Sequence, residues 1–345
     1  MLICPRILII IVLSVFSFLP PAIAQSPERL RIMFYNTENL FDPFGDSISE
    51  YNAFTARGEM YWTFGKFSKK IINLYKTIVA VGEWNAPCLV GLCEIENRFV
   101  LNWLTRQTPL SQFGYRIIQH DSPDRRGIDV ALLYRAKQAV LLHEEFLRIS
   151  IPGDSIFKTR DVLYAKFLML QSDTLHVFVV HLPSKIGGAV PTSSKRESVA
   201  IQIIRKTDSV FRHNGNSNIV IMGDFNDSPS SNLLTDFFEA DKISDNIAPS
   251  KLYNLMEKYK NKPAYGTHKF RGNWTIIDQI LVSGNLLLNN NFFIVENKAY
   301  IFSSDFLLED DPVNTGKKPF RTYEGFRYKG GFSDHLPVYT DIIKK

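Results

Sequence analysis

Short apolar runs, each about the length of one β-strand, recur along the chain and alternate with segments whose apolar residues follow helical spacing. The pattern predicts strands at residues 30–36, 89–94, 115–119, 128–134, 139–147, 162–170, 175–180, 219–222, 274–283 and 336–342. It predicts helices at 65–81, 99–105 and 193–211, a further helix from Ser230, and a long polar loop over 305–331. Because strands outnumber helices and the helices lie between them, we expect an α/β fold with mixed sheets flanked by helices in one domain.

The first 24 residues follow a different pattern from the rest of the chain. Arg6 is the only charged residue there, Ile7 to Leu19 is an apolar run, and the segment ends on Ala22-Ile23-Ala24. This order is typical of a cleaved export signal, and the run is short for a bilayer span. We therefore expect a signal peptide at 1–24, a mature domain at 25–345 without a membrane span, and export to the periplasm or the medium.

Composition and charge set only loose limits on function. The chain has 345 residues, and 45% of them are hydrophobic, which is enough for a sizeable core. Its 40 basic and 35 acidic residues give a net charge of +5. This excess is compatible with an anionic substrate but does not require one, because most surface charges are simply solvated.

The residues that follow the buried strand at 219–222 are the strongest indication of chemistry. The strand stops at Gly223, and Asp224 and Asn226 follow at alternate positions. Residues two apart in an extended chain point to the same side. The two side chains should therefore stand together at the carboxyl end of a central strand, where α/β sheets commonly place their sites. A carboxylate beside a carboxamide is suited to hold a water nucleophile or a phosphate oxygen.

Other predicted strands also begin or end on a polar side chain. Asn36, Glu94 and His181 each follow an apolar run, and Ser333-Asp334-His335 directly precedes the last strand. Asp278 lies within an apolar strand, where it must be paired or hydrogen-bonded, since an isolated buried carboxylate is very costly.

Taken in order, these motifs run Asn, Glu, His, Gly-Asp-x-Asn, Asp within a strand, and Ser-Asp-His, from Asn36 to His335. In this order the chain resembles the endonuclease/exonuclease/phosphatase superfamily, which includes deoxyribonucleases, AP endonucleases, inositol polyphosphate phosphatases and secreted sphingomyelinases. The resemblance implies a four-layered α/β sandwich, in which two packed mixed sheets are flanked by helices. It also implies a metal-dependent phosphoric ester hydrolase.

The resemblance assigns a metal site to three of these residues. Glu94 resembles the principal metal-binding glutamate, and Asn36 and Asp334 resemble its supporting residues. Such an oxygen donor set suits Mg²⁺, with Mn²⁺ or Ca²⁺ as alternatives. Glu96 is a rival for the role of Glu94, which we favour because it lies closer to the apolar run.

The resemblance assigns the catalytic roles to the remaining motifs. Asp224 resembles the acid that orients or deprotonates the attacking water, and Asn226 the amide that holds the scissile phosphate. His335 resembles the imidazole that contacts phosphate, with Asp278 as its orienting carboxylate. His181 resembles the histidine that stabilises or protonates the leaving oxygen. Whether Asp224 or a histidine is the general base stays open.

Three further segments are candidates for substrate contacts. Arg126 precedes a strand that resembles one beside the family's active site, and Ser184 and Lys185 follow His181. Between Tyr265 and Trp274, aromatic and basic residues alternate. That stretch suits base stacking and phosphate contacts, and it equally suits a β-hairpin with ordinary packing.

These motifs lead us to expect an exported, monomeric, Mg²⁺-dependent phosphodiesterase that cleaves nucleic acid. Ile221 stands where inositol polyphosphate phosphatases carry tryptophan, and AP endonucleases lack a counterpart of His181, which disfavours both. A sphingomyelinase-like enzyme that cleaves phospholipid is the main alternative. A non-catalytic binding module is the weaker one, because none of the site residues is lost.

Overall fold

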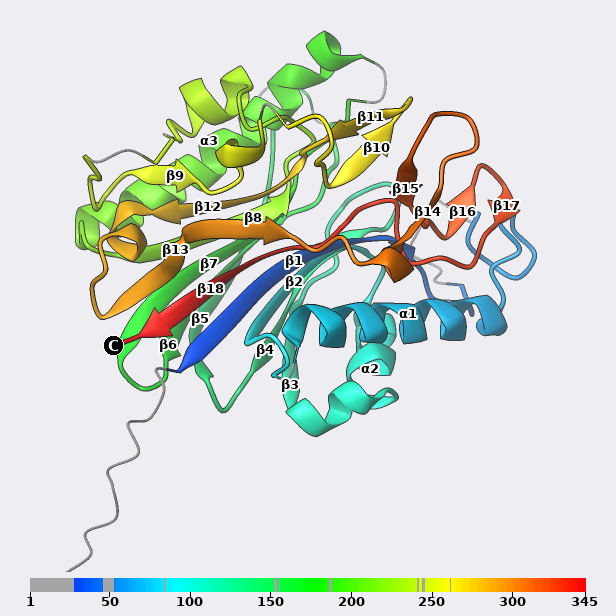
Figure 1. Cartoon of the computed structure of the whole chain (residues 1–345), viewed down its shortest axis with the longest axis horizontal. Coiled ribbons are helices and arrows are strands. Elements are labelled where there is room, and N and C mark those ends of the chain that lie inside the picture. Colours follow the sequence, from blue (N-terminus) through cyan, green and yellow to red (C-terminus); the bar gives the residue numbers. More distant parts are fainter. Residues whose placement is uncertain are drawn as a thin grey trace, which may run out of the picture.

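The computed structural model describes residues 28–345 apart from 46–52, 84, 152–153, 155, 186–187, 241, 244–245 and 261, so the predicted signal peptide lies outside the described residues. Two six-stranded mixed sheets form its centre (Figure 1). The first sheet has the order β13 (Phe292–Ile301), β18 (Val338–Lys344), β1 (Arg29–Leu40), β2 (Leu89–Ile95), β4 (Asp129–Arg135), β3 (Tyr115–Gln119). The second has the order β5 (Ala139–Leu147), β6 (Val162–Met169), β7 (Asp173–His181), β8 (Asn218–Asp224), β12 (Asp278–Ser283), β9 (Leu252–Asn254).

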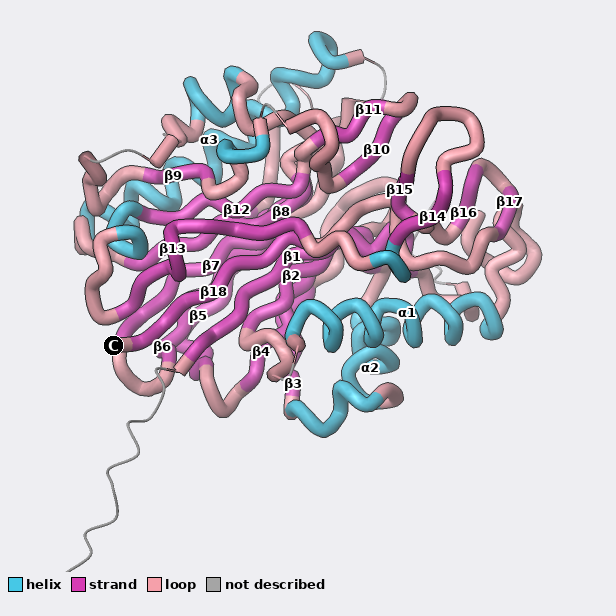
Figure 2. Tube along the Cα trace, viewed as in Figure 1, coloured by secondary structure: helices cyan, strands magenta, loops and turns pink. Residues whose placement is uncertain are grey.

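Helices cover the outer face of each sheet, which completes the predicted four-layered α/β sandwich (Figure 2). Helices α1 (Phe64–Gly82) and α2 (Arg98–Arg106) pack on the first sheet, and α3 (Ala189–His213) packs on the second. No helix among the described residues combines the length and the apolar character that crossing a bilayer requires.

The alternation of side chains along the central strands explains the layers. In β1, Ile32 and Phe34 lie in the core between the sheets, whereas Met33 and Tyr35 lie beneath the helices. In β8, Val220 and Met222 face the other sheet and Ile221 faces α3. Because both faces of these strands are buried, they read as continuous apolar runs in the sequence.

Helix α1 shows why the helical pattern was readable. Its buried residues Phe67, Ile71, Leu74 and Ile78 recur at helical spacing, and Thr63 caps its first turn by accepting a hydrogen bond from the Lys66 amide. The predicted bounds at 65–81 agree with the observed helix to within one residue at each end.

Several elements differ from the prediction. The helix expected from Ser230 is a single π-helical turn, Leu233–Phe237, and Glu239 just beyond it takes a left-handed φ of 44°, which interrupts helical bonding. The strand expected at 274–283 is split into β11 (Asn273–Thr275) and β12, so Asp278 begins a strand. Strand β11 forms a hairpin with β10 (His268–Phe270).

The loop expected over 305–331 also carries structure. It holds two short hairpins, β14 (Leu308–Asp310) with β15 (Lys317–Pro319), and β16 (Tyr323–Glu324) with β17 (Arg327–Tyr328). Gly316 and Gly325 take φ values of 83° and 58° at their turns. Such short strands hold too few residues to show an alternation of apolar and polar positions.

Candidate active site

Both sheets bring polar side chains to one edge of the sandwich. In the first sheet β1 and β2 are parallel and carry Asn36 and Glu94 near their carboxyl ends. In the second sheet β7 and β8 are parallel, and His181 pairs with Asp224 at the end of the register. The antiparallel strand β12 begins at this edge, with Asp278 opposite Asp224. The last predicted motif, which ends at His335, precedes β18 there as well.

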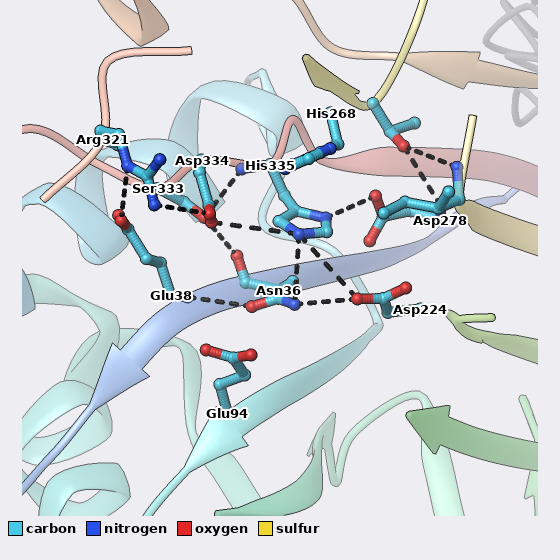
Figure 3. Close-up of polar contacts among 12 residues, drawn as sticks. Asn36, Glu38, Glu94, Asp224, His268, Asp278, Arg321, Ser333, Asp334 and His335 are labelled. Carbon is cyan, nitrogen blue, oxygen red and sulfur yellow. Dashed lines mark hydrogen bonds and ion pairs between the residues drawn. The ribbon is translucent and has the colours of Figure 1, made fainter. Parts of the chain in front are cut away.

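Two hydrogen bonds join the sheets through these residues (Figure 3). Asn36 Nδ2 donates to Asp224 Oδ2 at 3.1 Å, and His335 Nδ1 donates to Asp278 Oδ2 at 2.7 Å. His335 Nε2 lies 3.9 Å from Asp224 Oδ2, and His181 Nε2 lies 3.7 Å from the same oxygen. The structure thus brings together four of the five predicted catalytic residues around the Asp224 carboxylate.

The fifth, Asn226, is positioned by the backbone beyond β8. Its amide donates to Asp224 Oδ1 at 2.8 Å, and its Nδ2 donates to the carbonyl of Leu182 at 3.0 Å. A carboxamide nitrogen carries two hydrogens, so one of them is left for a ligand. Asn226 adopts a left-handed φ of 50°, a conformation that costs free energy and that its two hydrogen bonds hold in place.

The charges at this edge are set by burial and by neighbouring carboxylates. Burial alone would lower the pKa of His335, but Asp278, Asp224 and Asp334 outweigh it and raise that pKa well above its usual value. Burial and the repulsion of Asp278 raise the pKa of Asp224 to about 7. His335 is therefore a cation at neutral pH, and Asp224 exchanges its proton close to neutrality.

His181 has the opposite character. Burial, together with Arg160, Arg126 and His335, lowers its pKa well below the usual value. Its Nδ1 is buried and has no hydrogen-bond partner among the described residues. His181 is therefore a neutral imidazole at neutral pH, able to donate one hydrogen bond or to accept a proton.

The predicted metal ligands lie on the first sheet and on the segment before β18. Asn36 Oδ1 accepts a hydrogen bond from the Glu38 amide at 2.9 Å, and Glu94 Oε2 accepts one from the Asn39 amide at 2.9 Å. Asp334 accepts from Arg321 Nη2 at 3.0 Å. Burial opposes the ionisation of Asp334, but His335 and Arg321 prevail and hold its pKa below the usual range.

Local irregularities of β1 and β2 orient the acidic side chains. Glu38, Asn39 and Glu94 take left-handed φ values of 51°, 60° and 60°, and the register of β1 with β2 shifts between Asn36 and Leu40. Such bulges redirect side chains next to functional sites. They turn Glu94 toward Asn39, whereas the Glu96 carboxylate accepts from the Asp42 amide. The metal-binding role that we assign to Glu94 rather than to Glu96 stays a prediction.

Two clusters of acidic and histidine residues have ligand atoms within 4.8 Å of one another. They are Asp224, Asp278 and His335, and Asp334, His268 and His335. Both include His335, whose Nδ1 already bonds Asp278 and whose raised pKa keeps it protonated. A protonated imidazole cannot bind a metal. Asn36, Glu94 and Asp334 offer oxygen donors, which a hard cation prefers, and their role as metal ligands stays a prediction.

The sequence prediction missed a second group of charged residues behind this edge. Arg321 Nε donates to Glu38 Oε1 at 3.2 Å, the Thr322 amide donates to Glu38 Oε2 at 2.6 Å, and the buried Lys70 Nζ lies 4.0 Å from the same oxygen. Glu38 stands two residues after Asn36, the spacing that drew attention to Asp224 and Asn226. Arg321 comes from the segment expected to be a long polar loop, where no motif pointed to it.

The candidate substrate contacts are placed differently from one another. Arg126 is partly exposed, donates to Asn39 Oδ1 at 2.6 Å and lies 3.6 Å from Glu94 Oε1, at the rim of the metal residues. Ser184 is half-buried on the segment after β7 and stays a prediction. Lys185 is paired with Asp227 at 2.7 Å.

Fold and site together define a class of phosphoesterase. The model of the Endonuclease/Exonuclease/phosphatase family matches residues 31–344, and the chain belongs to this family. Members of the family are metal-dependent phosphoric ester hydrolases. No curated protein matches the sequence.

Solved structures share this fold at low sequence identity. A mannosyl-6-phosphatase from Bacteroides thetaiotaomicron is 17% identical, with a TM-score of 0.56 over 91% of this chain and 99% of that one. The human Nocturnin catalytic domain with bound sulfate is 15% identical, with a TM-score of 0.55 over 92% and 95%. Danio rerio TDP2 complexed with single-strand DNA product is 11% identical, with a TM-score of 0.53 over 91% and 98%. At these identities the likeness is one of fold.

Proposed function

We propose that this protein is an exported, Mg²⁺-dependent phosphodiesterase that cleaves nucleic acid. The observation that carries the proposal is the hydrogen-bonded group that joins the sheets, in which Asp224, Asn36, Asp278 and His335 converge on one edge. Export rests on the N-terminal sequence. The choice of nucleic acid is supported by the order of the motifs, by the net charge of +5 and by a structural neighbour that holds single-strand DNA.

The chain's own residues supply most of an in-line displacement at phosphorus. Asp224 takes the proton of the attacking water, for which a pKa near 7 is well matched at neutral pH. His335 and the second Nδ2 hydrogen of Asn226 oppose the charge that grows on the non-bridging oxygens. His181 donates a hydrogen bond to the leaving oxygen. Asp278 keeps His335 charged and oriented throughout.

The residues fit a divalent cation by the chemistry of their donor atoms. Asn36, Glu94 and Asp334 offer one amide and two carboxylate oxygens, and the lowered pKa of Asp334, about 2, keeps it ionised at neutral pH. A cation held there supplies positive charge for the phosphate oxygens. Mn²⁺ and Ca²⁺ share this preference for oxygen ligands, so both belong in the test.

Plasmid nicking by the purified mature protein tests the proposal. We expect nicking with Mg²⁺, loss of nicking with EDTA, and a loss of about 10²-fold or more in Asp224→Asn and in His335→Ala. Asp208→Asn and His213→Ala are matched controls on exposed positions and should keep full activity. Full activity in EDTA or in both site variants would refute the mechanism. If the protein hydrolysed sphingomyelin vesicles and not DNA, the proposed substrate would be wrong and the proposed site would stand.

A further inference from the structure

An open cavity of about 460 Å³ lies next to the catalytic edge. Its wall is formed by the rings of Tyr259, Tyr265 and Trp274, with Lys260, Lys262 and Ser228 among the polar residues. The volume falls within the range of small-molecule sites, roughly 300–1,000 Å³. We call these six residues and the space they enclose the aromatic pocket.

The aromatic pocket is joined to the catalytic residues through short stretches of backbone. Ser228 stands two residues after Asn226, and Trp274 stands four before Asp278. Thr267, at the start of the hairpin that carries Trp274, accepts hydrogen bonds through Oγ1 from the amides of Ile277 and Asp278 at 3.1 and 3.2 Å. The hairpin therefore cannot shift without moving the carboxylate that orients His335.

A second bond ties the same hairpin to the segment of His335. The Leu336 amide donates to the carbonyl of Thr267 at 2.7 Å, and His268 forms an isolated β-bridge with His335. A group held against Trp274 is thus placed at a fixed offset from the phosphate-contacting imidazole. This is the arrangement that a subsite flanking a scissile phosphate requires.

Two rings of the aromatic pocket lie in tilted contact with each other. The centroids of Tyr259 and Tyr265 are 5.8 Å apart with the planes at 37°. Tyr259 is buried and its hydroxyl donates to the Ala299 carbonyl at 3.3 Å, which anchors that ring. Tyr265 is 53% exposed, and Trp274 is half-buried. An anchored ring beside two accessible ones offers π-faces to a flat ligand without much ordering on binding.

The lysines give the aromatic pocket its charge. Lys262 Nζ lies 5.6 and 6.0 Å from the ring centroids of Tyr259 and Tyr265, and it has no ion pair with a carboxylate among the described residues. Lys260 is paired with Glu257 at 3.1 Å. Lys262 is therefore an ammonium group that is available to an anion at the mouth of the pocket. Rings and an uncompensated cation together match a base and the phosphate attached to its sugar.

We propose that the aromatic pocket binds the base of the nucleotide that flanks the scissile phosphate, with Lys262 contacting the next phosphate. This assignment rests on the proposed phosphodiesterase activity and adds its substrate class. A lipid chain is a poorer occupant, because the lysines and Ser228 would lose water without gaining a partner. A sugar ring without a base leaves the aromatic faces largely unused.

The test compares a dinucleotide that also carries a phosphate at each end, so that a second phosphate is present beside either base, with two analogues in which one base or the other is replaced by an abasic tetrahydrofuran residue. In the wild type, one of the two analogues should show a KM about tenfold higher than the dinucleotide, since tenfold lies within the range that stacking on one base contributes. Trp274→Ala should raise KM for the dinucleotide by about the same factor and leave kcat and that analogue unchanged. Trp274→Phe should restore most of the affinity.

Phe326→Ala is the control, because Phe326 is a 72% exposed aromatic residue outside the aromatic pocket and outside the hairpin that carries Trp274. It should behave as the wild type. A melting temperature close to that of the wild type establishes that Trp274→Ala is folded. Lys262→Gln tests the phosphate contact independently: it should raise KM at low salt, and this effect should disappear at high salt.

The possible failures are distinguishable. If the wild type cleaves neither the dinucleotide nor its analogues, the proposed function fails. If it cleaves all three with equal KM and Trp274→Ala changes nothing, the phosphodiesterase stands and the aromatic pocket is not a base subsite. Preference for a sugar phosphate that depends on Trp274 would overturn the nucleotide assignment in favour of a sugar.

Discussion

The charge of His335 depends on Asp278 more than on any other single residue. Burial by itself favours the neutral imidazole, and the contact of 2.7 Å with Asp278 reverses that preference. In Asp278→Asn the pKa of His335 should fall, with Asp224 and Asp334 left to oppose the effect of burial. Loss of the cation that faces phosphate should lower kcat by about 10²-fold.

Histidine side-chain NMR across pH, combined with kcat, checks this prediction. The His335 ring should stay protonated at pH 8 in the wild type and be neutral there in Asp278→Asn. Asp208→Asn, an exposed substitution of the same type, serves as the control. An unchanged His335 titration in Asp278→Asn would contradict the electrostatic argument, whatever the activity.

A second histidine should couple stability to pH. His176 is buried, its Nδ1 accepts from the Tyr164 hydroxyl at 2.8 Å, and burial followed by Lys166, Lys206 and His213 lowers its pKa to about 4. The unfolded chain binds a proton below about pH 6.5, while the folded protein does not until about pH 4. The free energy of unfolding should therefore fall as pH drops from 6.5 to 4, by at most about 1.4 kcal/mol per pH unit.

Urea titrations at several pH values measure this slope. The buried His181 and the half-buried His268 also have lowered pKa values, so they contribute slopes of the same sign. The informative quantity is the difference between wild type and His176→Gln, which should show the smaller loss toward pH 4. Parallel curves for the two proteins would show that His176 is not responsible.

At the scale of elements, helix α1 holds the segment that carries Arg321 and Asp334. Lys70 Nζ donates to Thr322 Oγ1 and to the Phe332 carbonyl, both at 2.5 Å, and lies 4.0 Å from Glu38. Asn73, one turn later, donates to the carbonyls of Gly330 and Gly331. Lys70→Met removes this buried cation, which leaves the Thr322 hydroxyl and the Phe332 carbonyl without their donor and leaves the charge of Glu38 to be balanced by Arg321.

Lys70→Met should therefore lower the free energy of unfolding by about 3–5 kcal/mol. Urea denaturation measures it, with Lys69→Met on the exposed face of α1 as the control. Adding Glu38→Gln to Lys70→Met should recover part of the loss, because the buried negative charge is removed as well. A double variant that is less stable than Lys70→Met would contradict this account of the pairing.

The same scale shows what the sequence could and could not predict. Helix α1 was readable because burial of one face imposes a period on its apolar residues, and the central strands were readable because burial of both faces makes them continuous apolar runs. The bulges at Glu38, Asn39 and Glu94 were not, since left-handed φ values at non-glycine residues leave no mark in an alternation. The choice between Glu94 and Glu96 depends on such a bulge. The position of Arg321 next to Glu38 depends on hairpins that are too short to leave a pattern in the sequence.

At the scale of the whole molecule, the site exists only where the two sheets meet. The first sheet and the segment before β18 supply Asn36, Glu94, Asp334 and His335, and the second supplies Asp224, Asp278 and His181. The bonds Asn36–Asp224 and His335–Asp278 cross between them. The individual motifs could be recognised along the chain. Their convergence could not, because it follows from the packing of the two sheets, which brings their polar edges together.

A cation bound at this junction should stabilise the whole domain, because it binds the folded protein and not the unfolded chain. At a Mg²⁺ concentration 100 times Kd the gain is about 2.7 kcal/mol, which corresponds to a rise of about 4 °C in Tm for a chain of this length. Thermal unfolding with Mg²⁺ and with EDTA measures the difference. Glu94→Gln should lose most of the rise, whereas Glu144→Gln, an exposed change of the same kind, should keep it. An equal rise in Glu94→Gln would place the ion elsewhere and leave Glu94 without its proposed role, even if the enzyme required Mg²⁺ for activity.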